Sequence, residues 1–427
     1  MPKDWEVFRL SEVVPRAEYG ISISLDDEIG IPVLRMNNLK DGEVELSDLK
    51  KSASSKAANL LLKPLDVLFN RTNSIEHVGR TSIWRGQIEQ VSFASYLVRL
   101  IPDQSKLIPN YLNIWLNLPS TQLLIRRYAT PGVQQVNINP TNLRKVLIAL
   151  PKNLLEQKNI AEILDTVDEA IARTSSLITK LKQTKAGLLQ DLLTRGLDED
   201  GQLRDPLAHP EQFKDSPLGQ IPKSWTFTEF GALIAQGIQN GIYKPESSYS
   251  NDGVPIVRID GFYDGVLVNQ ESFRRLRLSE TEVRRYALNN EDILINRVNS
   301  INFLGKSAIV LGLSEPTVFE SNIMRLSLKL EFLLPSYAIL LLTCFMQRQL
   351  QSQAKSAIAQ ASINQYDVRS CHIALPLIVE QSQIAEIVNQ QNIRIRTEEA
   401  YFNKLKLQKQ GLMQDLLTGK VRVSTIK

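Results

Sequence analysis

Apolar residues in two long stretches of this chain recur at alternating steps of four and three, between residues 156–194 and again between 380–418. That spacing puts them on one side of a helix, as the a and d positions of a coiled coil. We therefore predict two long helices, at residues 152–196 and 377–420. The expected seam consists of Ile160, Leu164, Val167, Ile171, Thr174, Ile178, Leu181, Lys185, Leu188 and Leu192, followed in the second helix by Ile384, Val388, Gln391, Ile395, Glu398, Phe402, Leu405, Lys409, Leu412 and Leu416.

The two helical stretches are copies of each other. Residues 156–163 and 190–194 return at one constant offset as residues 380–387 and 414–418, with about half of the aligned positions identical, so the repeat is secure. Each helix has a seam to bury, and the other copy is the obvious partner. An antiparallel pairing would relate the two halves of the chain by a pseudo-twofold axis.

Shorter hydrophobic runs elsewhere predict two globular domains of the α+β class, at residues 1–151 and 222–376. In the first domain, residues 31–36, 67–70 and 91–100 have the composition of strands, and residues 111–128 have that of a helix. The same series returns in the second domain, where residues 292–300 repeat residues 66–74. Asp41-Gly42 and its copy Asp264-Gly265 each predict the turn of a hairpin.

The predicted order is thus domain, helix, domain, helix. The fold class is α+β, with two homologous globular domains separated by two long helices that form an antiparallel coiled coil. Residues 197–221, rich in Asp, Gly and Pro, are expected to be an exposed connector, and residues 421–427 a tail.

Composition narrows the class of protein. A chain of 427 residues with 43% hydrophobic content can form more than one packed core, and a net charge of +4 does not by itself indicate nucleic acid. Two cysteines and three scattered histidines predict neither a disulfide framework nor a metal site. The N-terminus has no signal-peptide pattern and no apolar run is long enough to span a bilayer, so we expect a cytoplasmic protein.

Several motifs in this order carry a resemblance to a known family. They are the Ala-Leu-Pro stop ahead of a Glu-Gln-x-x-Ile-Ala-Glu-Ile helix, the Leu-Leu-Gln-Asp-Leu-Leu-Thr helix end, the Leu-Gly-x-Ile-Pro-x-x-Trp entry at residues 218–225, and the paired Asn-Arg-x-Asn-Ser loops. Together they resemble the specificity subunit of type I DNA restriction-modification systems across nearly the whole chain. The N-terminal copy departs slightly, because Trp5 has no Leu-Gly lead.

The resemblance implies two target recognition domains, each reading one half of a bipartite duplex DNA sequence across a spacer of unread bases. It also implies that the helices dock two copies of an adenine methyltransferase subunit and recruit ATP-driven restriction subunits. S-adenosylmethionine, ATP and magnesium are then expected on those partners, and no cofactor on this chain.

No catalytic motif is apparent in the chain itself. The adenine methyltransferase signature is an Asn or Asp before Pro-Pro-Tyr or Pro-Pro-Phe. It is absent, and Asn139-Pro140-Thr141 does not replace it. Gly305-Lys306-Ser307 resembles the end of a phosphate-binding loop but lacks the first glycine, since position 300 is serine. We therefore expect activity to lie in partners.

Candidate DNA contacts fall into two groups. Two domains that read different half-sites should agree where they grip phosphate and differ where they touch bases. Arg71 and Arg297, with Asn73 and Asn299, are shared between the halves, so they are candidates for phosphate or groove-edge contact. The alternative is that the asparagines only cap a local turn.

Positions that differ between the halves are candidates for sequence reading. Residues 130–134, which include Gln134, stand against residues 355–359, which begin with Lys355. The densest basic run includes Arg274, Arg275, Arg277 and Arg284, the last on a short helix capped by the Ser279-x-x-Glu282 box, and it is either a solvated face or a DNA-binding face. The complete set of expected DNA contacts is Arg71, Asn73, Arg297, Asn299, Arg35, Arg258, Lys50, Lys51, Arg80, Gln134, Arg274, Arg275, Arg277, Arg284, Lys306 and Lys355.

Two lysines, Lys185 and Lys409, fall at seam positions. They either control register or face a partner, or their stems lie along the seam while the ammonium groups reach solvent. The expected subunit-interface residues are Ile160, Ile171, Lys185, Ile384, Ile395 and Lys409.

Two other classes of function remain open. A scaffold with two interaction domains on a coiled-coil spacer, without DNA, is the serious alternative. A stand-alone methyltransferase or nuclease is disfavoured by the missing motifs.

Overall fold

The computed structural model describes residues 2–25, 28–132, 135–356 and 360–423. The chain divides into two compact units. The first contains Met1–Ser176 and Glu399–Lys427, and the second contains Leu177–Glu398. Each unit therefore holds one globular domain and one half of each long helix.

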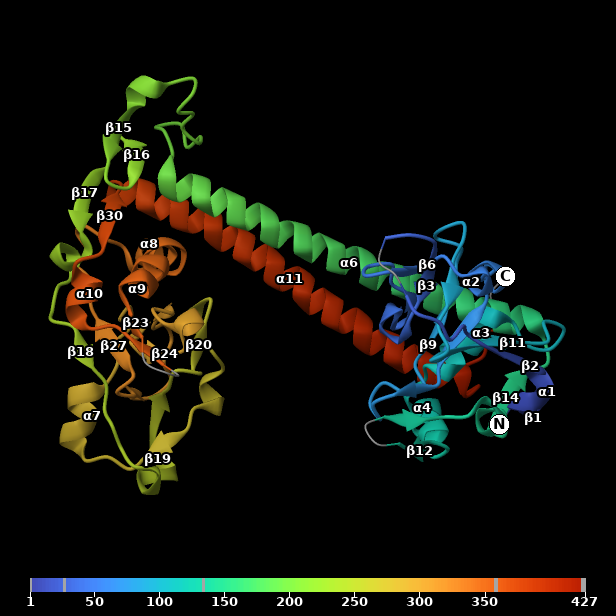
Figure 1. Cartoon of the computed structure of the whole chain (residues 1–427). Helices are drawn as coiled ribbons and strands as arrows, with labels where there is room; N and C mark the ends of the chain where they lie inside the picture. Colours follow the sequence, from blue (N-terminus) through green and yellow to red (C-terminus); the bar gives the residue numbers. More distant parts are fainter. Residues whose placement is uncertain (1, 26–27, 133–134, 357–359, 424–427) are drawn as a thin grey trace. The chain divides into compact units, whose positions relative to one another are not determined.

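The first domain is built from short strands and short helices (Figure 1). Its strands are β1 (Trp5–Arg9), β2 (Arg16–Tyr19), β3 (Ile31–Leu34), β4 (Leu39–Lys40), β5 (Gly42–Val44), β6 (Lys50–Ser52), β7 (Val67–Asn70), β8 (Thr72–Asn73), β9 (Thr81–Ile83), β10 (Ser92–Phe93), β11 (Leu97–Ile101), β12 (Thr130–Pro131), β13 (Val136–Asn137) and β14 (Leu147–Pro151). Its helices are α1 (Leu10–Val13), η1 (Met36–Asn38), α2 (Ser55–Asn59), α3 (Pro109–Leu116), α4 (Pro119–Arg126) and α5 (Pro140–Leu143).

The second domain repeats this series. Its strands are β17 (Thr226–Glu229), β18 (Gln239–Asn240), β19 (Tyr249–Val257), β20 (Phe262–Tyr263), β21 (Gly265–Leu267), β22 (Arg275–Leu276), β23 (Ile293–Asn296), β24 (Val298–Asn299), β25 (Ser307–Ile309), β26 (Val318–Phe319), β27 (Ile323–Leu326), β28 (Lys355–Ser356), β29 (Ala361–Ser362) and β30 (His372–Leu375). Its helices are η3 (Phe230–Leu233), η4 (Glu246–Ser248), η5 (Gln270–Ser272), α7 (Glu280–Tyr286), η6 (Ile301–Phe303), α8 (Pro335–Leu341), the π-helical turn η7 (Leu342–Met346), α9 (Gln347–Gln353) and α10 (Gln365–Arg369).

Sheet topology shows that the sequence repeat is a repeat of the fold. The largest sheet has the strand order β2-β11-β7-β9-β5-β4 in the first domain and β18-β27-β23-β25-β21-β20 in the second. Three smaller sheets also correspond: β10-β3-β6 with β26-β19-β22, β12-β13-β8 with β28-β29-β24, and β1-β14 with β17-β30. The predicted α+β fold with two homologous domains is confirmed.

The two Asp-Gly turns are hairpin turns, as their sequence predicts. Lys40 pairs with Glu43, so Asp41 and Gly42 form a two-residue loop. Both loop residues have positive φ, 49° and 90°, and the same holds for Asp264-Gly265, at 50° and 83°. A type I′ turn needs positive φ at both central residues, and its twist matches the flanking strands.

Three sequence predictions needed correction in detail. The strand expected at residues 91–100 is two strands, β10 and β11, with residues 94–96 between them. Residues 111–128 do not form one helix, because α3 ends at Leu116 and α4 begins at Pro119. Proline cannot donate a backbone hydrogen bond, and it forces the preceding residue, Leu118, into an extended conformation. The strand expected at residues 31–36 stops at Leu34, and η1 follows.

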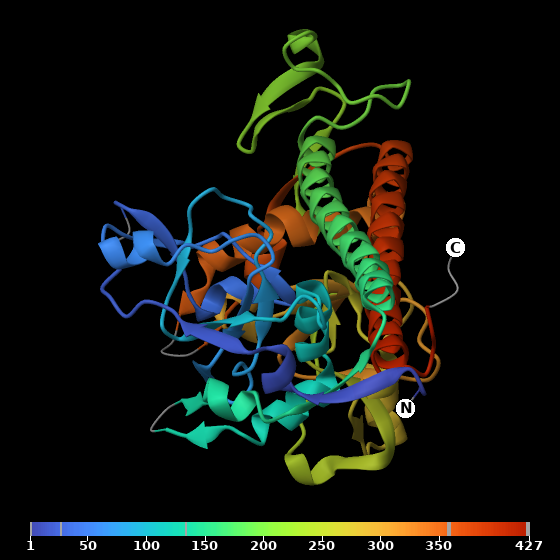
Figure 2. The same cartoon turned by 90° about the vertical axis from the view of Figure 1, so that its right-hand side faces the viewer.

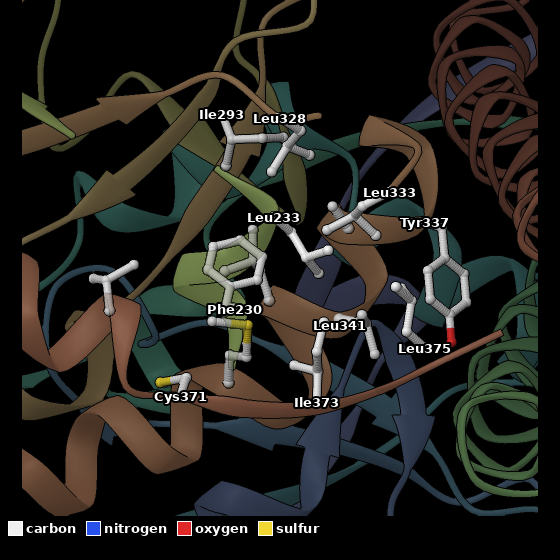
Figure 3. Packing of buried hydrophobic residues seen from close by; sticks show 14 of the residues in the cluster. Phe230, Leu233, Ile293, Leu328, Leu333, Tyr337, Leu341, Cys371, Ile373 and Leu375 are labelled. Carbon is white, nitrogen blue, oxygen red and sulfur yellow. The ribbon is translucent and has the colours of Figure 1, made fainter. Parts of the chain in front are cut away.

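Each domain has its own apolar core, and the long helices are part of it. In the second unit, η3, β23, α8 and β30 contribute the side chains that meet in Figure 3, among them Phe230, Ile293 and Ile373. The same cluster includes Leu192 and Ile384 from the long helices. Burying such side chains stabilises the fold by about 1.5–3 kcal/mol each, so a domain and its helix ends form one packing unit.

The long helices are α6 (Leu154–Thr194) and α11 (Ile378–Leu417), of 41 and 40 residues. In each unit they lie side by side and antiparallel (Figures 1 and 2). Not one of the twenty predicted seam residues is exposed, including the polar ones. The predicted coiled-coil phase is therefore confirmed.

The Glu-Gln pair at the start of each helix holds the helix against its surroundings. The amide of Gln157 accepts a hydrogen bond from Ile108 N at 3.0 Å and donates to Lys106 O at 2.7 Å and to Pro151 O at 3.1 Å. Gln381 repeats these three contacts with Leu334 N, Phe332 O and Pro376 O. The fold therefore explains why both halves have glutamine at this position: it holds the start of the helix in the same way in each.

The glutamate of each pair binds the segment that follows the end of the other helix. Glu380 accepts hydrogen bonds from Leu197 N at 2.8 Å, from Arg204 Nη1 at 2.7 Å and from Trp225 Nε1 at 3.1 Å. Burial, and then the Glu380 carboxylate, raise the pKa of the nearby Tyr337 hydroxyl (Figure 3). In the first unit, Glu156 likewise pairs with an arginine beyond the end of the other helix, Arg422, at 2.7 Å.

The expected connector carries structure of its own. It contains η2 (Pro210–Gln212) and a hairpin of β15 (Phe213–Ser216) and β16 (Gly219–Pro222), drawn in light green in Figure 1. Phe213 and Ile221 are buried, whereas Leu207 is 92% exposed.

Candidate nucleic-acid interface

Arg71 lies between the central strand β7 and the short strand β8. Its backbone N donates to Tyr96 O at 3.0 Å, and its carbonyl accepts from Ile138 N at 2.8 Å. The guanidinium Nη1 donates to Ser95 O at 3.3 Å. The backbone of this residue is therefore held from two sides.

Arg297 occupies the same place in the second domain, between β23 and β24. Its backbone N donates to Asn322 O at 2.8 Å, its carbonyl accepts from Ile363 N at 3.0 Å, and its Nη1 donates to Ser321 O at 3.3 Å. The two arginines thus have matching backbone and side-chain partners.

Neither of these two arginines is paired with a carboxylate in the part of the chain that the structure describes. Most of the other candidate arginines are paired. Their ion pairs are Arg35–Asp48 at 2.8 Å, Arg258–Glu320 at 3.4 Å, Arg275–Glu315 at 2.6 Å, Arg284–Glu280 at 3.6 Å and Arg274–Glu246. The charge of Arg71 and of Arg297 therefore remains available to a phosphate, which gains affinity by releasing counterions.

The neighbouring asparagines fit the local-turn alternative better than direct contact. Asn73 Oδ1 accepts from Ser74 N at 2.8 Å, and Asn299 Oδ1 accepts from Ser300 N at 2.8 Å. In each loop an amide oxygen is used by the backbone, as in a capped turn.

The fold brings the shared arginine loop next to the stretch that differs between the halves. In the first domain, Asn73 of β8 pairs with Val136 of β13, which pairs with Pro131 of β12. In the second, Asn299 of β24 pairs with Ala361 of β29, which pairs with Ser356 of β28. Lys355 thus lies in β28 beside the Arg297 loop, while Gln134 lies outside the described residues.

Two tyrosines flank Arg71. The guanidinium carbon lies 5.1 Å from the ring centre of Tyr19, and Tyr96 supplies the carbonyl that holds the arginine N–H. Both rings are nearly half exposed, at 48% and 46%. A half-exposed aromatic ring beside a cation without a carboxylate partner is suited to contact with nucleic acid.

The comparisons with known proteins bear on this surface. The family model described as the type I restriction modification DNA specificity domain matches residues 2–183 and again residues 222–407. The chain belongs to this family.

Relatives match this chain over nearly its whole length. It is 28% identical to the putative type I restriction enzyme MjaX specificity subunit of Methanocaldococcus jannaschii, over 100% of this chain and 95% of that protein. It is 24% identical to the type I restriction enzyme EcoKI specificity subunit of Escherichia coli, over 99% and 89%. The family predicted from the motifs is confirmed.

Two solved structures share the fold of this chain. The S subunit of a type I restriction-modification system from M. genitalium superimposes with a TM-score of 0.59 at 14% identity, covering 96% of each chain. A chain from work on complex assembly and conformational transition of the type I R-M system gives a TM-score of 0.54 at 15% identity, covering 98% of each.

Most arginines of the basic run at residues 274–284 form ion pairs with glutamates. Arg274 pairs with Glu246 and stacks on Tyr249, with its guanidinium carbon 3.8 Å from the ring centre. Arg275 also donates to Gly253 O at 2.7 Å. Arg277 is exposed, and among the described residues no carboxylate pairs with it. The run is therefore mainly a network of ion pairs on the surface.

Lys306 does not fit the DNA contact expected from the sequence. Its ammonium group donates to Ile259 O at 2.6 Å and lies 3.9 Å from the ring centre of Tyr263 and 4.8 Å from that of Phe262. Burial lowers its pKa. The Lys306 side chain is buried within its own domain, and its ammonium group is already bound to a backbone carbonyl.

The remaining basic candidates of the first domain lie in two places, in β6 and just before β9. Lys50 and Lys51 belong to β6, and Lys51 Nζ donates to Glu28 O at 3.4 Å. Arg80 is exposed just before β9 and follows Gly79, whose N–H donates to Asn70 O at 2.8 Å. The latter hydrogen bond ties Arg80 closely to the Arg71 loop.

The residues expected at a subunit interface are buried or half-buried by contacts within this chain. Ile160 and Ile384 are completely buried in the cores of their units, and Ile395 is 7% exposed. Ile171 and Lys185 are half-buried. Within this chain Ile160, Ile384 and Ile395 make internal contacts, and the role of the set at a subunit interface stays a prediction.

Lys409 is engaged within the seam. Its ammonium lies 2.6 Å from Asp168 of the opposite helix. Burial raises the pKa of Asp168, and the lysine opposes that shift. The ammonium group of Lys409 is therefore paired across the seam, at a place where both side chains are partly exposed.

Sequence reasoning missed the glutamine and glutamate contacts at the helix starts and the tyrosines beside Arg71. A signal was present, because the residues next to shared anchors differ: Tyr19-Gly20 stands against Asn240-Gly241, and Ser95-Tyr96 against Ser321-Asn322.

The described residues contain no group of three or more His, Cys, Asp or Glu side chains arranged to hold a metal ion. No helix among them is both long enough and apolar enough to cross a membrane.

Proposed function

We propose that this chain is the non-catalytic specificity subunit of a type I restriction-modification complex, and that each domain binds one half of a bipartite duplex DNA target. One observation carries the proposal. An equivalent arginine, Arg71 or Arg297, bound to a backbone carbonyl and without a carboxylate partner among the described residues, stands in each domain beside a strand pair whose sequence differs between them. A phosphate grip that is shared, next to surfaces that are not, is what two readers of different half-sites require.

The proposal includes the partners. Two methyltransferase subunits dock on the outward faces of α6 and α11, and restriction subunits join the complex. S-adenosylmethionine, ATP and magnesium bind to those partners, and the complex acts in the cytoplasm. The outward faces are suited to this because the seam faces are already buried within the chain.

The direct test is to express the chain with its methyltransferase partner and to map methylated adenines across the host genome. We expect one bipartite motif: two short specified sequences separated by a fixed number of unread bases. The isolated chain, given S-adenosylmethionine and duplex DNA, should transfer no methyl group and cleave nothing.

A matched control distinguishes the DNA reader from a scaffold without DNA. The complex should bind duplex containing the motif with an affinity that falls steeply with salt, because phosphate contacts release counterions. Methylation or cleavage by the isolated chain, or a complete complex that has no sequence preference, would contradict the proposal.

A further inference from the structure

Tyr19 of the first domain and Asn240 of the second are structural equivalents. The register of β2 against β11 pairs Tyr19 with Val98, and that of β18 against β27 pairs Asn240 with Met324. Their partner strands are themselves aligned alike on the central strand, since Val98 faces Phe69 and Met324 faces Ile295.

Tyr96 and Asn322 are equivalents by a second, independent contact. Each offers its carbonyl oxygen to the backbone N–H of the shared arginine, at 3.0 Å for Arg71 and at 2.8 Å for Arg297. Two positions around one contact that both domains share therefore carry tyrosine in the first domain and asparagine in the second.

The backbone at these positions is fixed while the side chains differ. Gly20 and Gly241 follow the first position, and a Cβ atom on either would lie 2.2 Å from a carbonyl oxygen, of Ala94 or of Glu320. Such a distance is impossible for a side chain, so the glycine lets the two chain segments touch. The neighbouring side chains are left on an exposed surface: Tyr19, Tyr96 and Asn240 are exposed, and Asn322 is half-buried.

We propose that Tyr19 and Tyr96 in the first domain, and Asn240 and Asn322 in the second, are specificity-determining residues that contact base edges next to the phosphate held by the shared arginine. This inference rests on the proposed function. It makes the arginine the common anchor and the flanking pair the variable reader.

The chemistry of the two pairs differs in a way that predicts their preference. An asparagine carboxamide has one donor and one acceptor side by side, which match N7 and N6 of adenine in the major groove. A tyrosine offers an apolar ring, suited to the methyl group of thymine or to stacking, and one hydroxyl. The second domain is therefore expected to specify adenine at the position read by Asn240 or Asn322.

The test exchanges the pairs. One variant carries Tyr19→Asn and Tyr96→Asn, and the other carries Asn240→Tyr and Asn322→Tyr. Each is assembled with the methyltransferase partner and used to select sequences from a randomised duplex library, so that the readout needs binding and not methyl transfer. We expect a changed base preference of about tenfold or more at one or two positions of one half-site. The other half-site should stay the same, and so should the salt dependence, because no charge changes.

The parental complex and a surface variant serve as controls. Val7→Asn alters a residue of β1 that is 48% exposed, as Tyr19 is, but lies in the separate β1-β14 sheet, and it should leave both half-sites unchanged. A parental complex that selects no bipartite sequence would sink the proposed function itself. If the parental complex selects one, then exchanged variants that keep the parental half-sites overturn the inference. Variants that assemble but select no sequence also overturn it, because the pairs would then supply general affinity.

Discussion

The arginines of this chain differ mainly in whether the fold pairs their guanidinium group with a carboxylate. A guanidinium paired with a carboxylate must break that pair before it binds phosphate, and it then gains little. Arg35 and Asp48 form such a pair at 2.8 Å, whereas Arg71 donates to a neutral carbonyl and stacks on Tyr19. The number of arginines on a surface is therefore a poor guide to how it binds DNA.

At the residue scale, we predict that Arg71→Gln weakens binding of the assembled complex to all duplexes about equally. Because one phosphate contact is lost, the slope of log affinity against log salt should fall by about one. The methylated motif should not change, since Arg297 makes the same contacts in the second domain and an arginine common to both domains does not distinguish their half-sites. Titrating labelled duplex at several salt concentrations measures both quantities.

Arg35→Gln is the matched control in the same domain, because its guanidinium is held by Asp48. It should leave the affinity and the slope unchanged. An equal loss in both variants would show that availability of charge does not identify the DNA-facing arginines.

At the element scale, the two helices have the same seam phase but differ at one facing pair. Asp168 of α6 pairs with Lys409 of α11, whereas the residue that matches Asp168 in the second copy is Asn392. Lys185, which matches Lys409, has no ion pair with a carboxylate in the described parts of the chain. Of these two equivalent lysines, Lys409 is thus paired across the seam, and Lys185 has no such ion pair among the described residues.

We predict that Lys409→Met destabilises the chain more at pH 7 than at pH 4. Burial already raises the pKa of Asp168, and the lysine is the main group that lowers it. Removing the lysine raises that pKa further, and a carboxyl group with a raised folded-state pKa contributes stability at low pH that is lost as pH rises through it. Unfolding by urea at the two pH values measures the effect, which should be about 1 kcal/mol at pH 7.

Lys185→Met is the control at the equivalent position, and its effect should show no such dependence on pH. A double variant, Lys409→Met with Asp168→Asn, should recover much of the loss, because the buried carboxylate is then gone. If the single and double variants are equally unstable at pH 7, the pair is not coupled.

At the scale of the whole molecule, both boundaries between the two units fall inside the long helices, so α6 and α11 each continue from one unit into the other. A helix of 41 residues is about 60 Å long at about 1.5 Å per residue. If the helices set the number of unread bases, that number should follow their length.

We predict that inserting one heptad into each helix, between Ile171 and Leu181 of α6 and between Ile395 and Leu405 of α11, lengthens the unread spacer. Seven residues add about 10.5 Å of helix, or about three base pairs. DNA bending can absorb part of the change, so we expect a gain of about one to three base pairs with both half-site sequences kept. Mapping methylated adenines genome-wide gives the motif.

The two insertions keep the seam phase and lie opposite each other, as the Asp168–Lys409 pair shows for the adjoining part of the seam. Inserting four residues instead of seven breaks the phase and should abolish methylation. A heptad variant that is active with the parental spacer would show that the helices do not set it.

The sequence by itself determined the repeat, the two helices and their seam, the Asp-Gly hairpins and the family. These features depend on local periodicity and on backbone conformations that few residue types adopt, and both are written in short stretches of chain. The positive φ of Asp41 and Gly42 and the burial of all the seam positions follow from such stretches. Duplication strengthened each prediction, because every pattern occurred twice.

Only the tertiary structure decided which basic residues remain available and what lies beside them. The ion pair of Arg275 with Glu315 joins residues 40 positions apart, and the enclosure of Lys306 by Tyr263 depends on how separate loops pack. The pairing of Arg71 with Tyr19 and Tyr96 likewise needs β2, β7 and β11 to lie side by side. Contacts of this kind depend on strand order and register, which no single stretch of sequence encodes.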